Sequence, residues 1–280
     1  MRKVLFVLAT LVLFGSLCMG SAMALNTEDL ARASAIEEIM KRGELLVGME
    51  AGYQPFEMQD EKGNIVGFDV DMAYEMGKAI FGKNGEKKVK LINTAWEGII
   101  PALMTRKFDI IMSGMTVLQS RNLKVNFCEP YYYIGQCILI NTKDKDKYKN
   151  YKDLNKPGLV VTSKLGVTGA WTAEKMMPKA TRRLFKTESE GALQVANGLA
   201  DAFIYDEPQV RVFDAKYGDK VMGIYEPITF EPLAWAIRKG DPDFLNFLNN
   251  FLRQVRGDGR WEQIKQKWFV DYIKETALKQ

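Results

Sequence analysis

The chain has 280 residues, enough for one large domain or two modest ones, and its 47% hydrophobic and 26% charged residues are typical of a globular protein. Its formal net charge is only +4, and no Lys/Arg-rich block with interleaved aromatics occurs, so we expect no nucleic-acid partner. Because the sequence contains no histidine, it excludes His-ligated metals and histidine-activated nucleophiles, and we expect no cofactor.

The N-terminus carries a predicted signal peptide. Two basic residues precede the apolar run VLFVLATLVLFG, and the small-residue stretch AMA ends at Ala24. We therefore predict that residues 1–24 are removed and that the mature protein is exported to the periplasm. Cys18 raises the alternative of a lipid anchor, but Leu17 is bulky where lipoprotein signals usually have a small residue.

The first half of the mature chain alternates predicted strands and helices. Apolar runs predict strands at 45–47, 89–92 and 108–112. Apolar residues at helical spacing predict helices around 72–80 and 98–106. This alternation indicates a mainly parallel sheet of the α/β class.

The pattern restarts after the polar stretch NTKDKDKYKN. Strands are predicted at 159–161, 184–185 and 202–205, with helices near 170–177 and 191–198. Two amphipathic helices follow, one opening at 241–242 and one at 261–273. Because the second unit has a build similar to the first, we predict an α/β protein of two lobes.

The mature chain keeps two cysteines, Cys128 and Cys137. The stretch EPYYYIGQ between them is predicted to be extended, which would separate them by about 30 Å. A disulfide requires Cα atoms within about 7 Å of each other. We therefore expect two unpaired thiols.

In the first predicted lobe a strand runs directly into a loop of small residues. The strand at 108–112 is followed by Ser113, Gly114, Met115 and Thr116, and then by Arg121. Such a loop lets a ligand approach backbone N–H groups, and the guanidinium fork matches a carboxylate bidentately. In open α/β sheets, ligands bind at the carboxyl ends of strands. The loop is therefore a candidate anion site.

The second predicted lobe offers a complementary group. The stretch LGVT at 165–168 repeats the small-residue pattern, and the strand at 202–205 ends at Asp206, a carboxylate that only accepts hydrogen bonds. Arg121 on one lobe and Asp206 on the other, facing a shared cleft, would clamp a zwitterion. Taken singly, either residue is more often a surface ion-pair partner of little energetic weight.

Four motifs resemble the family 3 periplasmic solute-binding proteins, the polar amino-acid receptors of ABC importers. They are GYQPFEM at 52–58, GFDVDMAYEMGKAI at 67–80, WEGIIPAL at 96–103 and GDGRWEQIKQKWF at 257–269. The resemblance covers essentially the whole mature chain. It implies a two-lobed periplasmic binding protein-like fold of type II, with the ligand in a cleft between the lobes.

In that family the chain crosses between the lobes twice. We place the crossings near 131–135 and 230–233. Residues 25–133 together with 231–280 then form the first lobe, and residues 134–230 form the second.

The resemblance also assigns ligand-binding roles by position. The residues it implies are Glu50, Tyr53, Trp96, Ser113, Gly114, Met115, Thr116, Arg121, Thr168 and Asp206. Arg121 looks like the arginine that grips the ligand α-carboxylate, and Thr168 like the hydroxyl residue that completes this site. Asp206 looks like the acceptor of the α-ammonium group.

The ligand side chain would lie between Tyr53 and Trp96, with its end near Glu50. This arrangement favours arginine or lysine, through cation–π contacts and an ion pair. Glutamine remains an alternative, because Glu50 could instead hydrogen-bond a side-chain amide. The resemblance implies that the protein binds a free L-amino acid by hinge closure and then docks on an ABC permease in the inner membrane. We expect it to be a monomer.

The main alternative is an enzyme on the same fold. Cyclohexadienyl dehydratases resemble this chain and use a cleft carboxylic acid for a decarboxylative elimination on prephenate or arogenate. Glu50 is the candidate acid here, since it would lie in an aromatic-lined pocket. Asp206, which suits an α-ammonium group, favours a receptor, so we expect no enzymatic activity.

Overall fold

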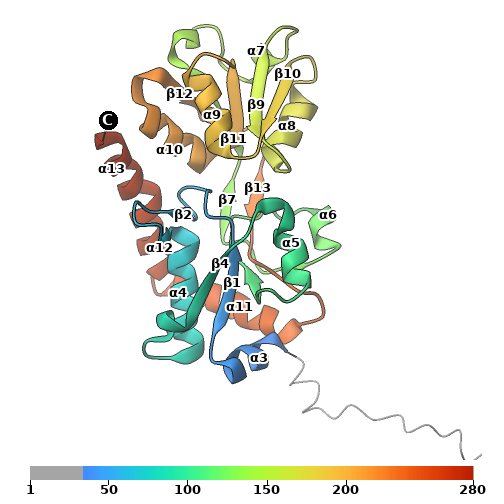
Figure 1. Ribbon diagram of the computed structural model, residues 1–280, viewed down its shortest axis with the longest axis vertical. Helices are drawn as coiled ribbons and strands as arrows, with labels where there is room; N and C mark the ends of the chain where they lie inside the picture. Colours follow the sequence, from blue (N-terminus) through green and yellow to red (C-terminus); the bar gives the residue numbers. More distant parts are fainter. Residues whose placement is uncertain (1–33, 280) are drawn as a thin grey trace, which may run out of the picture.

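The computed structural model describes residues 34–279, and these form two lobes, each built around a five-stranded sheet (Figure 1). The predicted signal peptide and Cys18 lie outside the described residues. Among residues 34–279, no helix combines the length and apolar character needed to cross a membrane.

The first lobe contains the sheet with strand order β4-β1-β5-β14-β6. These strands are β4 (Val89–Asn93), β1 (Leu45–Met49), β5 (Ile110–Ile111), β14 (Ala236–Ile237) and β6 (Asn126–Phe127). A short hairpin, β2 (Met58–Gln59) and β3 (Ile65–Val66), lies beside it. The helices of this lobe are α3 (Ala35–Arg42), α4 (Phe68–Phe81), α5 (Trp96–Met104), α6 (Gln119–Asn122) and α11 (Pro242–Gly257).

The second lobe contains the sheet with strand order β10-β9-β11-β8-β12. These strands are β10 (Thr181–Phe185), β9 (Val160–Lys164), β11 (Ala202–Asp206), β8 (Gln136–Asn141) and β12 (Val221–Ile224). Its helices are α7 (Tyr151–Leu154), α8 (Thr168–Met176), α9 (Glu188–Ala196) and α10 (Glu207–Tyr217).

Both sheets are mainly parallel, as predicted, and each contains one antiparallel strand, β14 in the first and β8 in the second. Strand β1 runs parallel to β4 and β5, and β9 runs parallel to β10 and β11, as alternating strands and helices require. Strands β14 and β8 pair antiparallel with their neighbours. Each of these two strands comes directly after the chain has crossed from one lobe to the other. It is therefore entered from a crossing strand and not from a helix, and this determines its direction.

Two short strands connect the lobes. Strands β7 (Tyr132–Ile134) and β13 (Glu231–Leu233) pair antiparallel with each other and form a sheet of their own between the two larger ones (Figure 1). Their positions agree with the two crossings expected at 131–135 and 230–233. We propose that the lobe boundaries lie in these strands.

The C-terminal residues return to the second lobe. Helix α12 (Arg260–Lys265) packs on α11 and α4, and a π-helical segment, η4 (Gln266–Asp271), leads into α13 (Tyr272–Leu278). Helix α13 lies along α10 (Figure 1). The end of the segment assigned to the first lobe therefore contacts the second.

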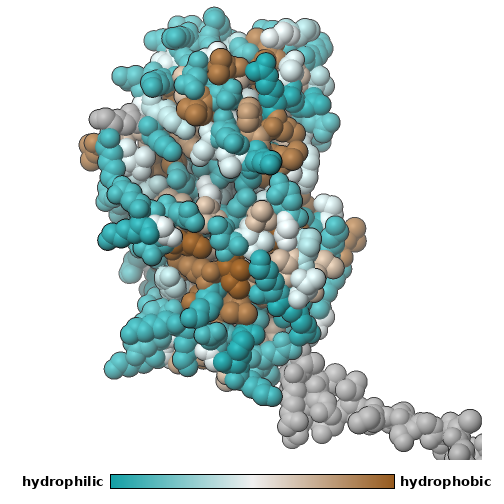
Figure 2. All heavy atoms as spheres, viewed as in Figure 1, coloured by the Kyte–Doolittle hydropathy of each residue, from teal (hydrophilic) through white to brown (hydrophobic). Residues whose placement is uncertain are grey.

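On the face shown in Figure 2, polar side chains cover much of both lobes. Figure 2 also shows apolar side chains gathered over the first lobe, around α4 and β4. The two thiols, Cys128 and Cys137, are buried and unpaired, as predicted.

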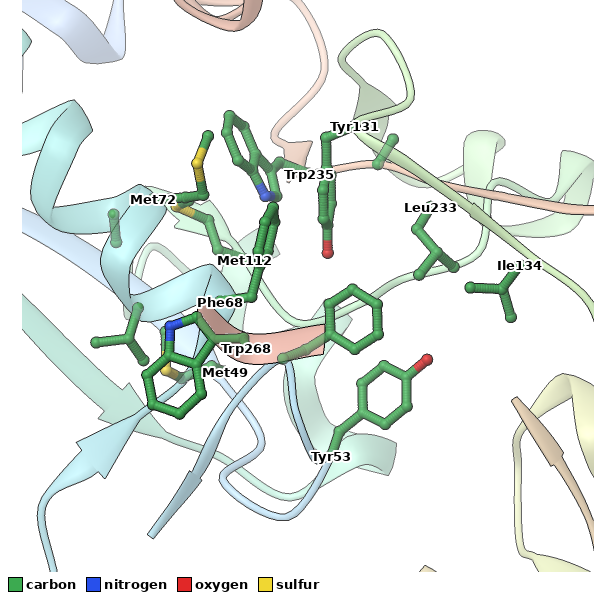
Figure 3. Packing of buried hydrophobic residues seen from close by; sticks show 14 of the residues in the cluster. Met49, Tyr53, Phe68, Met72, Met112, Tyr131, Ile134, Leu233, Trp235 and Trp268 are labelled. Carbon is green, nitrogen blue, oxygen red and sulfur yellow. The ribbon is translucent and has the colours of Figure 1, made fainter. Parts of the chain in front are cut away.

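A buried carboxylate fixes the loop that carries the candidate site. Asp69, in the first turn of α4, accepts hydrogen bonds from the Tyr131 hydroxyl (2.6 Å), the Trp235 indole (3.0 Å) and the Gly114 backbone N–H (3.0 Å). Burial raises the pKa of Asp69 to about 6. Figure 3 shows Tyr131 and Trp235 side by side, and their rings stack with centroids 5.1 Å apart. The GFDVD motif thus ties the loop at Gly114 to the crossing strands.

Candidate functional site

The two lobes meet at a narrow cavity that is lined by residues of both. Its lining residues are Glu50, Tyr53, Glu57, Trp96, Ser113, Gly114, Thr116, Arg121, Lys164, Val167, Thr168, Tyr205 and Asp206. Nine of these belong to the ten residues predicted from sequence. The structure therefore brings residues of both lobes together in one place.

Met115 is the exception, and its predicted role is corrected. Its side chain is not part of the cavity lining and is 1% exposed, packed with Ile99, Leu103 and Val125 in an apolar cluster. Thr116 forms a β-bridge with Leu233, so the chain is extended here. In an extended chain, successive side chains point to opposite sides. The Thr116 side chain therefore faces the cavity, and the Met115 side chain points into the core.

The Arg121 guanidinium uses few of its hydrogen-bond donors within the described residues. Within the described residues, its guanidinium donates one hydrogen bond, from Nη1 to the Thr116 carbonyl at 3.0 Å. It also lies over the rings of Trp96 (5.1 Å) and Trp171 (5.8 Å). Burial lowers the pKa of Arg121 to about 10, so the side chain is a cation at neutral pH. A guanidinium has five N–H donors, and the remaining ones are available to an anion in the cavity.

Asp206 ends β11 and lies on the opposite lobe. Its carboxylate accepts hydrogen bonds from the Tyr53 hydroxyl and the Gln136 amide, and Gln136 also donates to the Thr168 hydroxyl at 3.1 Å. Burial and the nearby Glu231 raise the pKa of Asp206 to about 7. Because Tyr53 belongs to the first lobe, its hydrogen bond joins the two lobes.

The absence of a side chain at Gly114 leaves room for the Tyr53 ring. A Cβ atom at Gly114 would lie 2.1 Å from that ring, and the glycine has a φ of +48°. A side chain at this position would therefore push the ring away from Asp206.

Trp96 and the start of α8 complete the far side of the cavity. The Trp96 indole donates to the Gly166 carbonyl at 3.0 Å, a second hydrogen bond between the lobes. Helix α8 begins at Thr168, and its N-cap residue Val167 makes no side-chain capping bond. An uncapped helix N-terminus at a cavity favours an anion. Together with Arg121, it forms a site suited to a carboxylate.

The other end of the cavity is ionic. The Lys164 ammonium, at the end of β9, forms ion pairs with Glu50 of the first lobe and with Glu188 of the second lobe, the latter at 3.1 Å. The side chains of Lys164 and Glu188 are each only 3% exposed. Sequence reasoning missed both. Lys164 ends its strand as Asp206 does, so the same strand-end rule could have found it.

Glu57 was also missed, although it lies in the motif GYQPFEM. It is fully buried and accepts a hydrogen bond from the Ser113 hydroxyl at 2.6 Å. Its second oxygen has no hydrogen-bond partner among the described residues. Burial, and then the neighbouring Asp69, raise the pKa of Glu57 well above its usual value, which favours a neutral acid. In residues 34–279, no three cysteine or acidic side chains converge as a metal site would require.

The sequence profile of the bacterial extracellular solute-binding proteins, family 3, matches residues 45–271. The chain belongs to this family. The resemblance of the four motifs is thus confirmed, and so is the two-lobed α/β fold of type II.

Relatives of this solute-binding protein include a probable histidine-binding protein of Neisseria gonorrhoeae. It is 30% identical over 80% of this chain and 82% of its own. A binding component of an ABC transporter from Wolinella succinogenes, complexed with lysine, is 49% identical with a TM-score of 0.78, covering 82% of this chain and 97% of its own. An ancestral amino acid-binding protein, a precursor of cyclohexadienyl dehydratase, is 44% identical with a TM-score of 0.78, covering 84% of this chain and 100% of its own.

Proposed function

We propose that this protein is the receptor of an amino-acid ABC importer and that its cleft closes on a free L-amino acid with a basic side chain. The observation that carries the proposal is the pairing of Arg121 and Asp206, which come from different lobes and line one buried cavity. The Arg121 fork suits the α-carboxylate, and Asp206 suits the α-ammonium group.

Hinge closure follows from the position of these two groups. Strands β7 and β13 connect the lobes and would absorb the change in dihedral angles. A zwitterion held by both Arg121 and Asp206 is fully paired only when the lobes are together. The ligand therefore favours the closed arrangement through its differential affinity for it.

The preference for a basic side chain rests on the ionic end of the cavity. Glu50 and Glu188 bring two carboxylates there, against the single ammonium of Lys164. One negative charge is left over, and a cationic side chain would balance it. The similar protein from Wolinella succinogenes was solved with lysine, and the ancestral relative is described as a cationic amino acid binder. Glutamine remains the competing ligand, since its amide could bond to Glu50.

A second candidate function is a cyclohexadienyl dehydratase activity. The ancestral relative is a precursor of such an enzyme, and Glu57 is a buried acid in the cavity wall whose pKa is raised by burial. Glu57 replaces the predicted Glu50 as the candidate acid, because Glu50 is ion-paired with the Lys164 ammonium. The receptor remains favoured, since Asp206 offers a partner for an α-ammonium group.

We also propose that the protein works in the periplasm, as a monomer, and delivers its ligand to a membrane permease. The family is one of extracellular proteins, which supports export. The predicted cleavage after Ala24 stays a prediction.

A thermal-shift screen tests the proposed function. Residues 25–280 would be unfolded and refolded to remove any bound ligand, then screened against the standard amino acids, ornithine, citrulline and prephenate. A ligand at a thousand times its Kd adds about 4 kcal/mol of stability, a large shift. We expect the largest shifts with arginine, lysine or ornithine. A shift only with glutamine or another neutral amino acid would refute the basic side chain. A shift only with prephenate, or none at all, would refute the receptor.

A further inference from the structure

Lys164 occupies an unusual position for a lysine. Its side chain is almost fully buried, and its ammonium lies between two carboxylates at the end of the cavity, Glu50 and Glu188. Buried lysines are rare unless they are paired. Burial alone would lower the pKa of Lys164, but the ion pairs with Glu188 and Glu50 outweigh burial and raise it, so the group is a cation.

The two carboxylates belong to different lobes. Glu188 begins α9 and Lys164 ends β9, so this pair lies within the second lobe and does not depend on closure. Glu50 follows β1 of the first lobe, so the pair of Lys164 with Glu50 forms only when the lobes approach. Opening the cleft would leave Glu50 without this ammonium.

We propose that Lys164 is a built-in competitor for the cationic side chain of the ligand. This inference rests on the proposed function and deepens it. As the cleft closes, the ligand cation and the Lys164 ammonium compete to form an ion pair with the same carboxylate, that of Glu50. Like charges about 4 Å apart repel each other, so a basic ligand must draw Glu50 away from Lys164, which then stays with Glu188. Lys164 thereby sets how strongly the cleft prefers a basic over a neutral amino acid.

There is space for this exchange. A groove whose lining includes Gly52, Asn93 and Thr187 adjoins the cavity. It shares Glu50 with the cavity and also includes Glu188. A flexible four-carbon side chain can move its ammonium toward such a groove without leaving Glu188.

The test is the ratio of the Kd for glutamine to the Kd for lysine or arginine, measured by isothermal titration calorimetry. Lys164→Met keeps the length of the side chain and removes its charge. We expect this ratio to rise at least about tenfold. In the variant no lysine ammonium competes with the ligand cation for the two carboxylates. Lys164→Arg keeps the charge and should raise the ratio less than Lys164→Met does. Lys147→Met, which removes an exposed partner of Asp144 in the same lobe, is the matched control and should change nothing.

A second variant and a second measurement distinguish a role in ligand competition from a role in folding. Lys164→Gln, which keeps a hydrogen-bond donor, replaces Lys164→Met if the latter fails to refold. Small-angle scattering without added ligand should give a larger radius of gyration for either variant than for wild type, since Glu50 and Glu188 then repel each other across the cleft. A role confined to folding would not open the cleft in this way.

The outcomes separate the two proposals. If wild type binds a basic amino acid and the ratio is unchanged in the folded variants, the competitor role is wrong while the receptor stands. A ratio that shifts toward glutamine would also overturn it, because Lys164 would then be a direct ligand contact. If wild type binds no basic amino acid, the basic-ligand receptor fails, and the competitor role fails with it.

Discussion

Replacing Arg121 with alanine is expected to weaken binding of the basic amino acid by two to three and a half orders of magnitude. Removing one partner of a buried charge pair costs about 3–5 kcal/mol, and each 1.4 kcal/mol corresponds to a factor of roughly ten. In this variant the α-carboxylate would enter the cavity without its guanidinium partner. Titration calorimetry with lysine and arginine measures the loss.

Two variants show whether the loss reflects the guanidinium fork. Arg121→Lys keeps the charge but not the bidentate geometry, so its affinity should lie between those of wild type and Arg121→Ala. Arg238→Ala is the matched control. Arg238 is partly buried and, like Arg121, donates to a backbone carbonyl, that of Phe108 at 2.9 Å, but it does not line the cavity. Wild-type affinity in a folded Arg121→Ala protein would disprove the carboxylate assignment.

Affinity should also depend on pH, because of Asp206. Its pKa is raised to about 7, so below neutrality much of the group is protonated and cannot accept the α-ammonium as an anion. An ammonium bound to the carboxylate stabilises the charged form and lowers the pKa, so binding releases a proton below pH 7. Affinity should therefore rise by up to about tenfold per pH unit from roughly pH 5 to 7 and then level off.

The variant Asp206→Asn tests this origin. It removes the titrating group that faces Tyr53 and Gln136, so affinity should fall and its dependence on pH between about 5 and 7 should largely disappear. Asp201→Asn is the control, because Asp201 likewise accepts from a tyrosine hydroxyl and an N–H group but lies outside the cavity. An unchanged pH profile in Asp206→Asn would show that another group, such as Glu57, titrates.

The fold could be predicted in outline because the hydrophobic pattern alternates so regularly. The expected strand at 89–92 is β4, and the expected helix at 98–106 is α5, shifted by two residues. What the pattern could not predict was strand direction after a crossing. Nothing local in QCILIN, which forms β8, distinguishes a parallel from an antiparallel neighbour, because that is decided by where the chain comes from.

The site could be predicted where a residue ends a strand, as Asp206 does, or follows shortly after a small-residue loop, as Arg121 does. Lys164 and Glu188 were missed because each looks ordinary by itself, one as a lysine that ends a strand and the other as an acid in the first turn of a helix. Their role depends on Glu50, which is more than a hundred positions from either in sequence. Only the approach of the two lobes brings the three together.

The central claim is that one closed cavity pairs the α-carboxylate, the α-ammonium group and a cationic side-chain end at the same time. Titration calorimetry of the refolded protein with three related ligands near pH 7.5 tests it most directly. L-lysine has all three groups, L-lysinamide lacks the carboxylate, and L-norleucine lacks the side-chain ammonium. The account predicts that each of the last two binds at least about a hundredfold more weakly than lysine. If norleucine or lysinamide bound within about threefold of lysine, the corresponding end of the cavity would not have the role given to it here.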